Sequence, residues 1–147
     1  MMDYLIDTGV LLRLFDSSDS ANTDIRRALK TIRSTSGRLF TTAQNISEFW
    51  NVSTRPSSAR GGYGQSAQIT NSRVQFIERY TSVLTETAVS YQHWRSLVVD
   101  HAITGVSVHD AKLVSIMLAN GIQKIVTLNA TDFQRYPGIE AVLPATV

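Results

Sequence analysis

The hydrophobic pattern of the chain alternates between short apolar runs and longer stretches with helical spacing. The short runs are bounded by polar or turn residues, which is typical of buried strands. Five strands are expected, at Asp3–Asp7, Arg38–Thr41, Val83–Leu84, Ile125–Leu128 and Glu140–Leu143.

Helical spacing separates these runs. The apolar residues of one segment lie at i, i+3, i+4 and i+7 and share one helix face: Ile25, Ala28, Leu29 and Ile32. Further helices are expected at Val10–Phe15, Ala43–Ser53, Gln65–Tyr80, from Thr87 onward and from Val108 onward. This alternation of strands and helices predicts an α/β fold, in which helices cover both faces of a mostly parallel sheet.

The length of 147 residues fits one domain, residues 1–147, which is large enough to bury a core without covalent staples. Because the chain has no cysteine, disulfides and thiolate zinc sites are excluded. A net charge of +2 permits RNA binding, but it is too small to indicate a nucleic-acid-binding protein by itself. Basic residues nevertheless cluster locally, at Arg26, Arg27, Lys30, Arg33 and Arg38 and again at Arg55, Arg60 and Arg73.

The sequence also bears on location. The N-terminus has no basic segment followed by a long apolar one, so no signal peptide is visible. No apolar stretch approaches the ~20 residues that cross a bilayer. Together with the lack of cysteine, these features lead us to expect a cytoplasmic protein without membrane contact.

Four carboxylates occupy positions that such a fold brings to one edge of its sheet. Asp7 ends the first strand, and Asp132 follows the fourth. Asp110 stands near the start of the last long helix, and Glu48 lies inside the helix that follows the second strand. Because ligands of open parallel sheets bind outside the carboxyl ends of the strands, we expect these acids to share one site.

Carboxylates gathered in one cleft repel one another unless a cation joins them. A site of oxygen ligands alone suits a hard divalent cation. The acids therefore favour a metal-dependent site for phosphodiester chemistry, in which the metal lowers the pKa of a water and polarises the phosphate.

Each acid also has a purely structural explanation. Asp7 fits a turn at a strand end, and Glu48 fits a solvated helix position. Ser107 and Asp110 form an S-x-x-D capping box, and Asp132 is a possible cap for the short turn after it. These explanations stay open for the residues taken singly, whereas their joint pattern favours an acidic metal site.

Four motifs carry a resemblance to a known family. They are Tyr4-Leu5-Ile6-Asp7-Thr8, Asn45-Ile46-Ser47-Glu48-Phe49, Ser107-Val108-His109-Asp110-Ala111 and Thr127-Leu128-Asn129-Ala130-Thr131-Asp132-Phe133. In this order and at these intervals they resemble a PIN domain of the VapC toxin type, and the resemblance covers nearly the whole chain. It implies a three-layer α/β/α fold with a central five-stranded, mostly parallel sheet.

The resemblance also implies an activity and partners. It implies a ribonuclease that depends on Mg²⁺ or Mn²⁺ and is the toxin of a type II toxin–antitoxin pair. The partners implied are an RNA substrate, a small antitoxin protein and a second copy of the chain in a homodimer. The helix with Phe49 and Trp50 and the nearby arginines Arg55 and Arg60 are the candidate surface for the antitoxin.

The family's acids map onto Asp7, Glu48 and Asp110, with Asp132 as the candidate for the fourth. Many relatives carry an Asp where this chain has Asn129, so the sequence departs from the family pattern at that ligand. In such a metal site, the hydroxyl of Thr8 or Thr127 is expected to donate to a carboxylate and to orient it toward the metal.

Two other functions compete with this interpretation. A non-catalytic PIN-like module that binds RNA or protein is favoured by Asn129 and opposed by the remaining acids. A receiver-type signalling module would need a phosphoacceptor Asp at a central strand end and a Lys after a late strand. The strands Arg38–Thr41 and Val83–Leu84 end without an Asp, and Lys124 precedes its strand, which opposes this second alternative.

Overall fold

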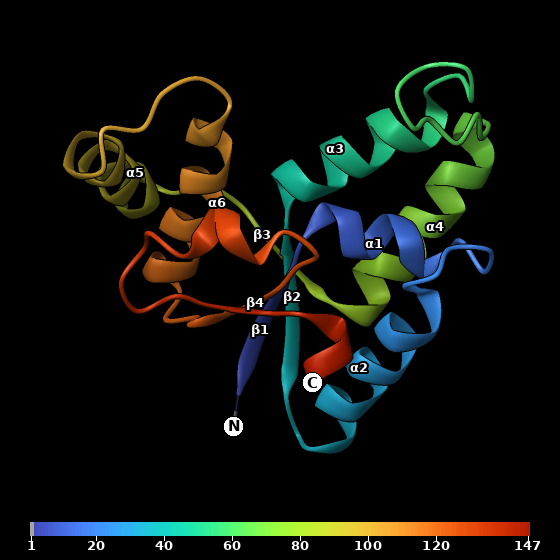
Figure 1. Cartoon of the computed structure of the whole chain (residues 1–147), viewed down its shortest axis with the longest axis horizontal. Coiled ribbons are helices and arrows are strands. Elements are labelled where there is room, and N and C mark those ends of the chain that lie inside the picture. Colours follow the sequence, from blue (N-terminus) through green and yellow to red (C-terminus); the bar gives the residue numbers. More distant parts are fainter. Residues whose placement is uncertain (1) are drawn as a thin grey trace.

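A single parallel sheet forms the centre of the computed structural model, which describes residues 2–147 (Figure 1). Its strands are ordered β3-β2-β1-β4-β5, and every neighbouring pair is parallel. The predicted α/β fold is therefore confirmed, with an all-parallel sheet in place of a mostly parallel one. The strands are β1 Asp3–Ile6, β2 Arg38–Thr42, β3 Ser82–Leu84, β4 Lys124–Val126 and β5 Glu140–Val142.

Helices cover both faces of this sheet and complete three layers. Figure 1 shows α1 to α4 on one side of the strands and α5 and α6 on the other. None of the helices within residues 2–147 is long and apolar enough to cross a bilayer. The helices are α1 Thr8–Leu14, α2 Asn22–Ser34, α3 Ala43–Thr54, α4 Ala67–Tyr80, α5 Ala88–Asp100 and α6 Ser107–Ala119, with short 3₁₀ turns η1 Ala130–Phe133 and η2 Pro144–Thr146.

The apolar core is divided in two by the sheet. Neighbouring residues of a strand point to opposite faces, so Leu5 and Ile6 of β1 belong to different clusters. Ile6 packs with Val10 and other residues of the α1–α4 side, while Leu5 packs with Val114 and other residues of α6. Because Leu5 and Ile6 are fully buried on opposite faces of β1, the end of this strand is held in a fixed position for the residues that follow it.

The first helix begins earlier than the sequence suggested. The pattern predicted a start at Val10, after Gly9 had broken the strand, but α1 begins at Thr8 and includes the glycine. Asp7 consequently occupies the N-cap position, and its carboxylate accepts the backbone N–H of Thr8 at 2.8 Å. The strand-to-helix junction thus lies directly at a candidate site residue.

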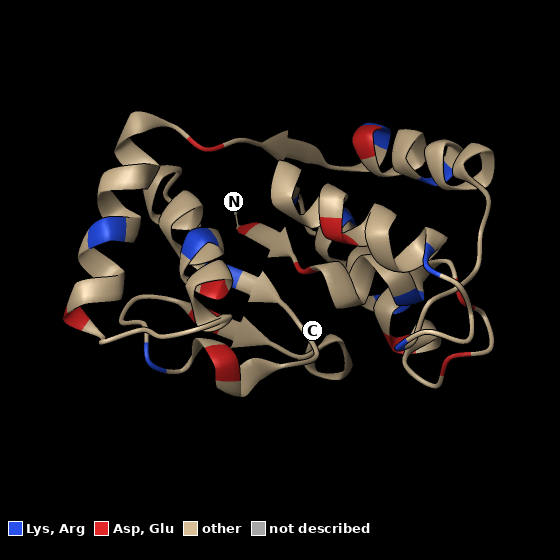
Figure 2. Ribbon diagram, turned by 90° about the horizontal axis from the view of Figure 1, so that it is seen from above, with Lys and Arg blue, Asp and Glu red and all other residues tan. Residues whose placement is uncertain are grey.

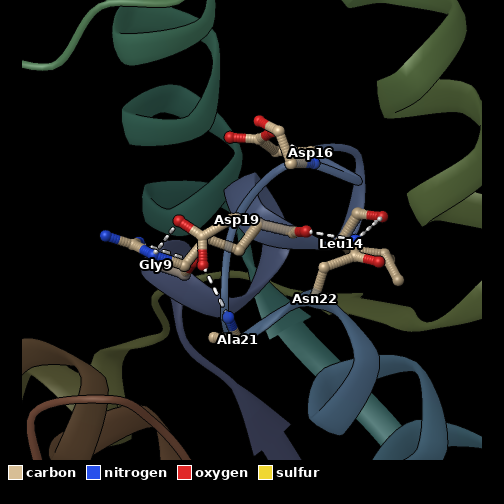
Figure 3. A network of polar contacts seen from close by, with 8 residues as sticks. Gly9, Leu14, Asp16, Asp19, Ala21 and Asn22 are labelled. Atoms are coloured by element: carbon tan, nitrogen blue, oxygen red, sulfur yellow. Dashed lines mark hydrogen bonds and ion pairs between the residues drawn. The ribbon is translucent and has the colours of Figure 1, made fainter.

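The other end of α1 is held by the connector to α2 and by the first residue of α2 (Figure 3). The side-chain amide of Asn22 donates to two of the last carbonyls of α1, Arg13 O at 2.7 Å and Leu14 O at 3.2 Å. Arg13 in turn donates to Gly9 O and pairs with Asp19 at 3.3 Å. These contacts satisfy carbonyls that a helix C-terminus otherwise leaves open, and they fix α1 against α2.

The glycine-containing loop before α4 is a connector. Its backbone N–H groups, from Tyr63, Gly64 and Gln65, donate to carbonyls at the end of α3 at 2.8–3.1 Å. The loop therefore completes the C-terminal end of α3, and Ser66 then caps α4.

Candidate active site

Four elements bring the candidate acids to the carboxyl end of the sheet. Asp7 follows β1 and its N–H donates to Val126 O of β4 at 3.0 Å. Glu48 lies in the second turn of α3, Asp110 in the first turn of α6 and Asp132 in η1, just after β4. Figure 2 shows acidic residues at a strand end and on helices of both layers.

The charges of these acids influence one another. The pKa of Asp110 is raised to about 6, chiefly by burial and in addition by the charges of Asp132, Asp7 and Glu48, while the charge of His109 lowers it. Burial also raises the pKa of Asp7, against hydrogen bonds from Thr127 and Thr8, with the charges of Glu48 and Asp132 adding to the increase. The four acids therefore lie close enough to share one electrostatic field.

Asp7 is held by two donors. One oxygen accepts the N–H of Thr8, and the other accepts the hydroxyl of Thr127 at 2.7 Å. The Thr127 oxygen in turn accepts the backbone N–H of Asn129 at 3.1 Å, so its single proton is directed toward the carboxylate. Thr127 is fully buried, and its bond therefore fixes the orientation of Asp7 from inside the protein.

Glu48 receives donors on both oxygens as well. The hydroxyl of Thr8 donates to Oε2 at 3.2 Å, and the side-chain amide of Gln44 donates to Oε1 at 2.9 Å. The same amide also donates to the carbonyl of His109 at 3.2 Å and so links α3 to α6. Asn45 donates to the Thr8 hydroxyl at 2.9 Å. Both expected threonines thus contact a candidate acid.

Sequence reasoning missed Gln44 and Asn45 as members of this network. Their spacing from Glu48, at i−4 and i−3, places them on the same helix face, and this was the available signal. Residues with side-chain amides are common at such positions of helices, so the role of Asn45 became visible only because the structure places Thr8 between it and Glu48.

The capping explanations for two acids are wrong. The N-cap of α6 is Val106, and no side chain caps that helix, so Ser107 and Asp110 do not form the S-x-x-D box. The N-cap of η1 is Asn129, and no side chain caps that turn either, so Asp132 lies within the turn instead of starting it. Neither acid is therefore explained by its helix end.

A cleft of about 690 Å³ opens between α3, α6 and the segment after β3. Glu48, Asp110 and the exposed His109 line it, and Lys112 of the same wall pairs with Glu86 at 3.5 Å. In the side-chain arrangement of residues 2–147, no group of three or more Asp, Glu, His or Cys is arranged to hold a metal ion. Two of the four acids, Glu48 and Asp110, thus line the open cleft, and a metal site made by all four would require their side chains to turn toward a common point.

The sequence-based surface for a protein partner needs correction. Phe49 is only 1% exposed and packs inside the α1–α4 core, so it is not available to a partner. Trp50 is partly buried against the same core. The aromatic side chains that do reach the surface on this side belong to α4, where Phe76 is 39% exposed and stacks on Tyr80.

Comparison with solved structures finds the same fold in toxin–antitoxin proteins. A chain of VapBC2 from Rickettsia felis bound to promoter DNA superposes with a TM-score of 0.71 at 13% identity, over 97% of this chain and 98% of that one. A chain of DNA-bound VapBC from Salmonella typhimurium gives 0.70 at 16% identity, over 98% and 99%. VapC20 of Mycobacterium tuberculosis, a toxin that cleaves the sarcin-ricin loop, gives 0.63 at 18% identity, over 93% and 98%.

Sequence comparison gives the family itself. No curated protein matches the chain. The family model described as PIN domain matches residues 4–139, a span that begins in β1, ends just before β5 and includes all four candidate acids. The chain therefore belongs to the PIN domain family.

Proposed function

We propose that this protein is a metal-dependent endoribonuclease and the toxin of a type II toxin–antitoxin pair, acting as one domain in the cytoplasm. The observation that carries the proposal is the electrostatic coupling of Asp7, Glu48, Asp110 and Asp132 at one edge of the sheet. PIN domains are nucleases, and VapC20, a relative in fold, cleaves an RNA loop. RNA is therefore the substrate class that we infer.

The donor set fits Mg²⁺ or Mn²⁺. All four candidate ligands offer carboxylate oxygens, which hard divalent cations prefer. The pKa of Asp110 and that of Asp7 are raised first by burial and in addition by the neighbouring acids, and a divalent cation bound beside them would stabilise their ionised forms. Asp7, Glu48 and Asp110 would hold the ion, and Asp132 is the candidate for a further ligand. The chemistry supplied by such an ion is activation of water and neutralisation of charge on the phosphate.

The chain's own residues prepare the site. The hydrogen bonds from Thr127 and from the backbone N–H of Thr8 favour the ionised form of Asp7, against the effect of its burial on the pKa, and they fix its orientation. Gln44 and Thr8 hold Glu48 at the wall of the cleft. The open cleft leaves room for single-stranded RNA, whose phosphodiester would be attacked in line by water to leave a 5′-phosphate and a 3′-hydroxyl.

The direct test is cleavage of RNA by the purified protein during a titration of Mg²⁺ or Mn²⁺. We expect no cleavage in EDTA, recovery when either ion is added back, and products with 5′-phosphate ends by kinase and phosphatase treatment. Cleavage that persists in EDTA, or a metal-replete protein that binds RNA without cutting it, would reject the proposal.

Asp132 is the least secure member of the set, and Asp132→Asn tests it. Because Asp132 caps nothing, the change should leave the melting temperature within about 1–2 °C, which corresponds to a few tenths of a kcal/mol. We expect lower cleavage at limiting Mn²⁺ and partial recovery at high Mn²⁺, since a metal ligand is lost. If Asp132→Asn cleaves RNA at the parental rate at every Mn²⁺ concentration, Asp132 is not a ligand and the site consists of three carboxylates. Asn129→Asp, which restores the acid common in the family, should increase Mn²⁺ affinity.

The antitoxin would bind the surface between α2 and α4, which we call the aromatic groove. It is lined by Leu14, Arg26, Leu29, Phe76 and Tyr80. The guanidinium of Arg33 lies 4.4 Å from the centre of the Tyr80 ring, and that of Arg73 lies 5.4 Å from the Phe15 ring. An apolar surface rimmed by arginines is complementary to a segment with apolar and acidic side chains.

Phe76→Ala checks this assignment by calorimetry with the cognate antitoxin. Exposed aromatic residues often dominate binding energy, so we expect Kd to rise by about tenfold or more. The matched control is Val89→Ala, which removes an exposed apolar side chain (54% exposed) from α5, on the opposite side of the sheet. Equal affinities for the parent and for Phe76→Ala would place the antitoxin elsewhere.

A homodimer is also part of the proposal, and α5 offers a surface for it. Tyr91 and Val99 are 55% and 65% exposed and, eight residues apart, share one face of that helix. We expect light scattering to give twice the chain mass, and Val99→Asp to shift the protein toward monomer. A monomer at high concentration in the parent would remove the homodimer from the proposal.

The competing function is a PIN domain that binds RNA without cutting it. Asn129, which stands where relatives often have an acid, is the feature that favours it. The titration described above separates the two, because a binding module would retain RNA whether or not a divalent ion is present. Growth arrest on expression of the chain, lost in Asp110→Asn, would also argue for the catalytic function.

A further inference from the structure

Asn45 lies beneath the candidate site, fully buried and outside the lining of the cleft. Its side-chain oxygen accepts two hydrogen bonds from Thr42, from the backbone N–H at 3.2 Å and from the hydroxyl at 2.7 Å. A backbone N–H can only donate, so the oxygen of the amide must face Thr42. The orientation of the Asn45 amide is therefore determined by the start of α3.

The amide's nitrogen then points to Thr8. It donates to Thr8 Oγ1 at 2.9 Å, and since an NH₂ group has no acceptor, the direction of this bond is certain. The hydroxyl has one proton, which is left for Glu48 Oε2 at 3.2 Å. That distance exceeds the ~2.5–2.7 Å of a strong hydroxyl–carboxylate bond, so the contact orients Glu48 without locking it.

The same device appears on the other side of the site. Thr127 accepts a fixed backbone N–H from Asn129 and donates to Asp7. In both cases an N–H group donates to the threonine oxygen, so the single hydroxyl proton is available for the carboxylate, Glu48 for Thr8 and Asp7 for Thr127. The difference is that Thr8 is directed by a side chain, which can be changed by mutation.

We propose that Asn45 is a positioning residue, which acts through the Thr8 hydroxyl to orient Glu48 for a divalent cation. This inference rests on the proposed function. Glu48 itself is exposed on α3, and each of its oxygens has one donor: Gln44 donates to Oε1 at 2.9 Å, and Thr8 donates to Oε2. Without the Thr8 proton, Oε2 would lose its donor, and the carboxylate could turn about its bond to Gln44. Partners of this kind behind a metal ligand typically contribute about 10–100-fold to metal affinity or activity.

A double-mutant cycle separates this role from simple helix capping. Asn45→Ala, Thr8→Val and the double variant are compared by Mn²⁺ calorimetry, RNA cleavage and melting temperature. Loss of the cap lowers the melting temperature in either background. If Asn45 acts through Thr8, however, its removal weakens Mn²⁺ binding only while the hydroxyl is present, so the two effects on affinity are not additive.

We expect Asn45→Ala and Thr8→Val each to weaken Mn²⁺ binding and cleavage about tenfold or more, and the double variant to be no worse than either. Thr8→Ser, which keeps the hydroxyl, should restore most of what Thr8→Val loses. Asn51→Ala is the control, an exposed asparagine on the same helix. If Asn45→Ala does not fold, Asn45→Asp replaces it, because it keeps the oxygen that accepts both hydrogen bonds from Thr42 but cannot donate to Thr8 when ionised.

Parental Mn²⁺ affinity in a folded Asn45 variant, or an equal loss of affinity in the Thr8→Val background, would overturn the inference. Asp7→Asn in the same assays identifies which claim has failed. If Asp7→Asn loses binding and cleavage while the Asn45 variant retains both, only the role of Asn45 is wrong. If Asp7→Asn binds Mn²⁺ and cleaves like the parent, the proposed function itself is wrong.

Discussion

Asp7→Asn should reduce RNA cleavage in Mg²⁺ or Mn²⁺ by about a hundredfold or more and leave the protein folded. The loss follows from the removal of a charged ligand from the site, since stabilisation of the phosphate by a metal amounts to several kcal/mol, at about tenfold for each 1.36 kcal/mol. Folding should survive because an amide has the same shape and can still accept the N–H of Thr8 and contact Thr127.

The control for this experiment is Asp100→Asn, the same change at an exposed acid at the end of α5. It should cleave like the parent. Undiminished cleavage by a folded Asp7→Asn protein would remove Asp7 from the site, whatever the control does. A loss of activity in both variants would point to net charge and not to the site.

Asp110→Asn should raise the melting temperature of the metal-free protein and lower that of the metal-loaded protein, each relative to the parent. In the metal-free fold the pKa of Asp110 is about 6, well above its ordinary value of 3.8. Between those two values the folded state holds a proton that the unfolded state has lost, so stability falls as pH rises from about 4 to about 6 and is then constant. Asn cannot ionise, so the stability of the Asp110→Asn variant does not fall over this pH range for this reason.

The expected measurement is a set of melting temperatures in EDTA. Relative to the parent, Asp110→Asn should gain little at pH 4, progressively more up to about pH 6.5, and a constant amount above that. With saturating Mn²⁺ at pH 7.5 the parent should gain stability through binding and the variant much less. A variant whose difference from the parent does not change with pH would contradict the electrostatic account of Asp110.

Much of the fold follows from the sequence because strands and helices differ in hydrophobic period. The five apolar runs were found within a few residues of β1 to β5, and the motif acids were placed at strand ends and helix starts. The start of α1 was misplaced because Gly9 was taken as a break. Helix starts depend on capping geometry, in this case the carboxylate of Asp7 on the Thr8 N–H, which a pattern of apolar residues does not contain.

The parts that could not be predicted involve side chains from distant segments. Thr127 reaches Asp7 across 120 residues, and Thr8 reaches Glu48 across 40. Phe49 was assigned to a partner surface because it stands beside Trp50 on an apparently amphipathic helix, yet it fills the core under α1. Burial of this kind depends on how α3 rotates against its neighbours, which its own sequence leaves open.

Diffraction from crystals soaked in Mn²⁺, with data collected at a wavelength where manganese scatters anomalously, tests the central claim most directly. The account predicts an anomalous peak in contact with Asp7 and Asp110, with Glu48 turned toward it, and no such peak in Asp7→Asn crystals soaked in the same way. A protein that cleaves RNA but carries its manganese elsewhere, or carries none between these acids, would contradict the account.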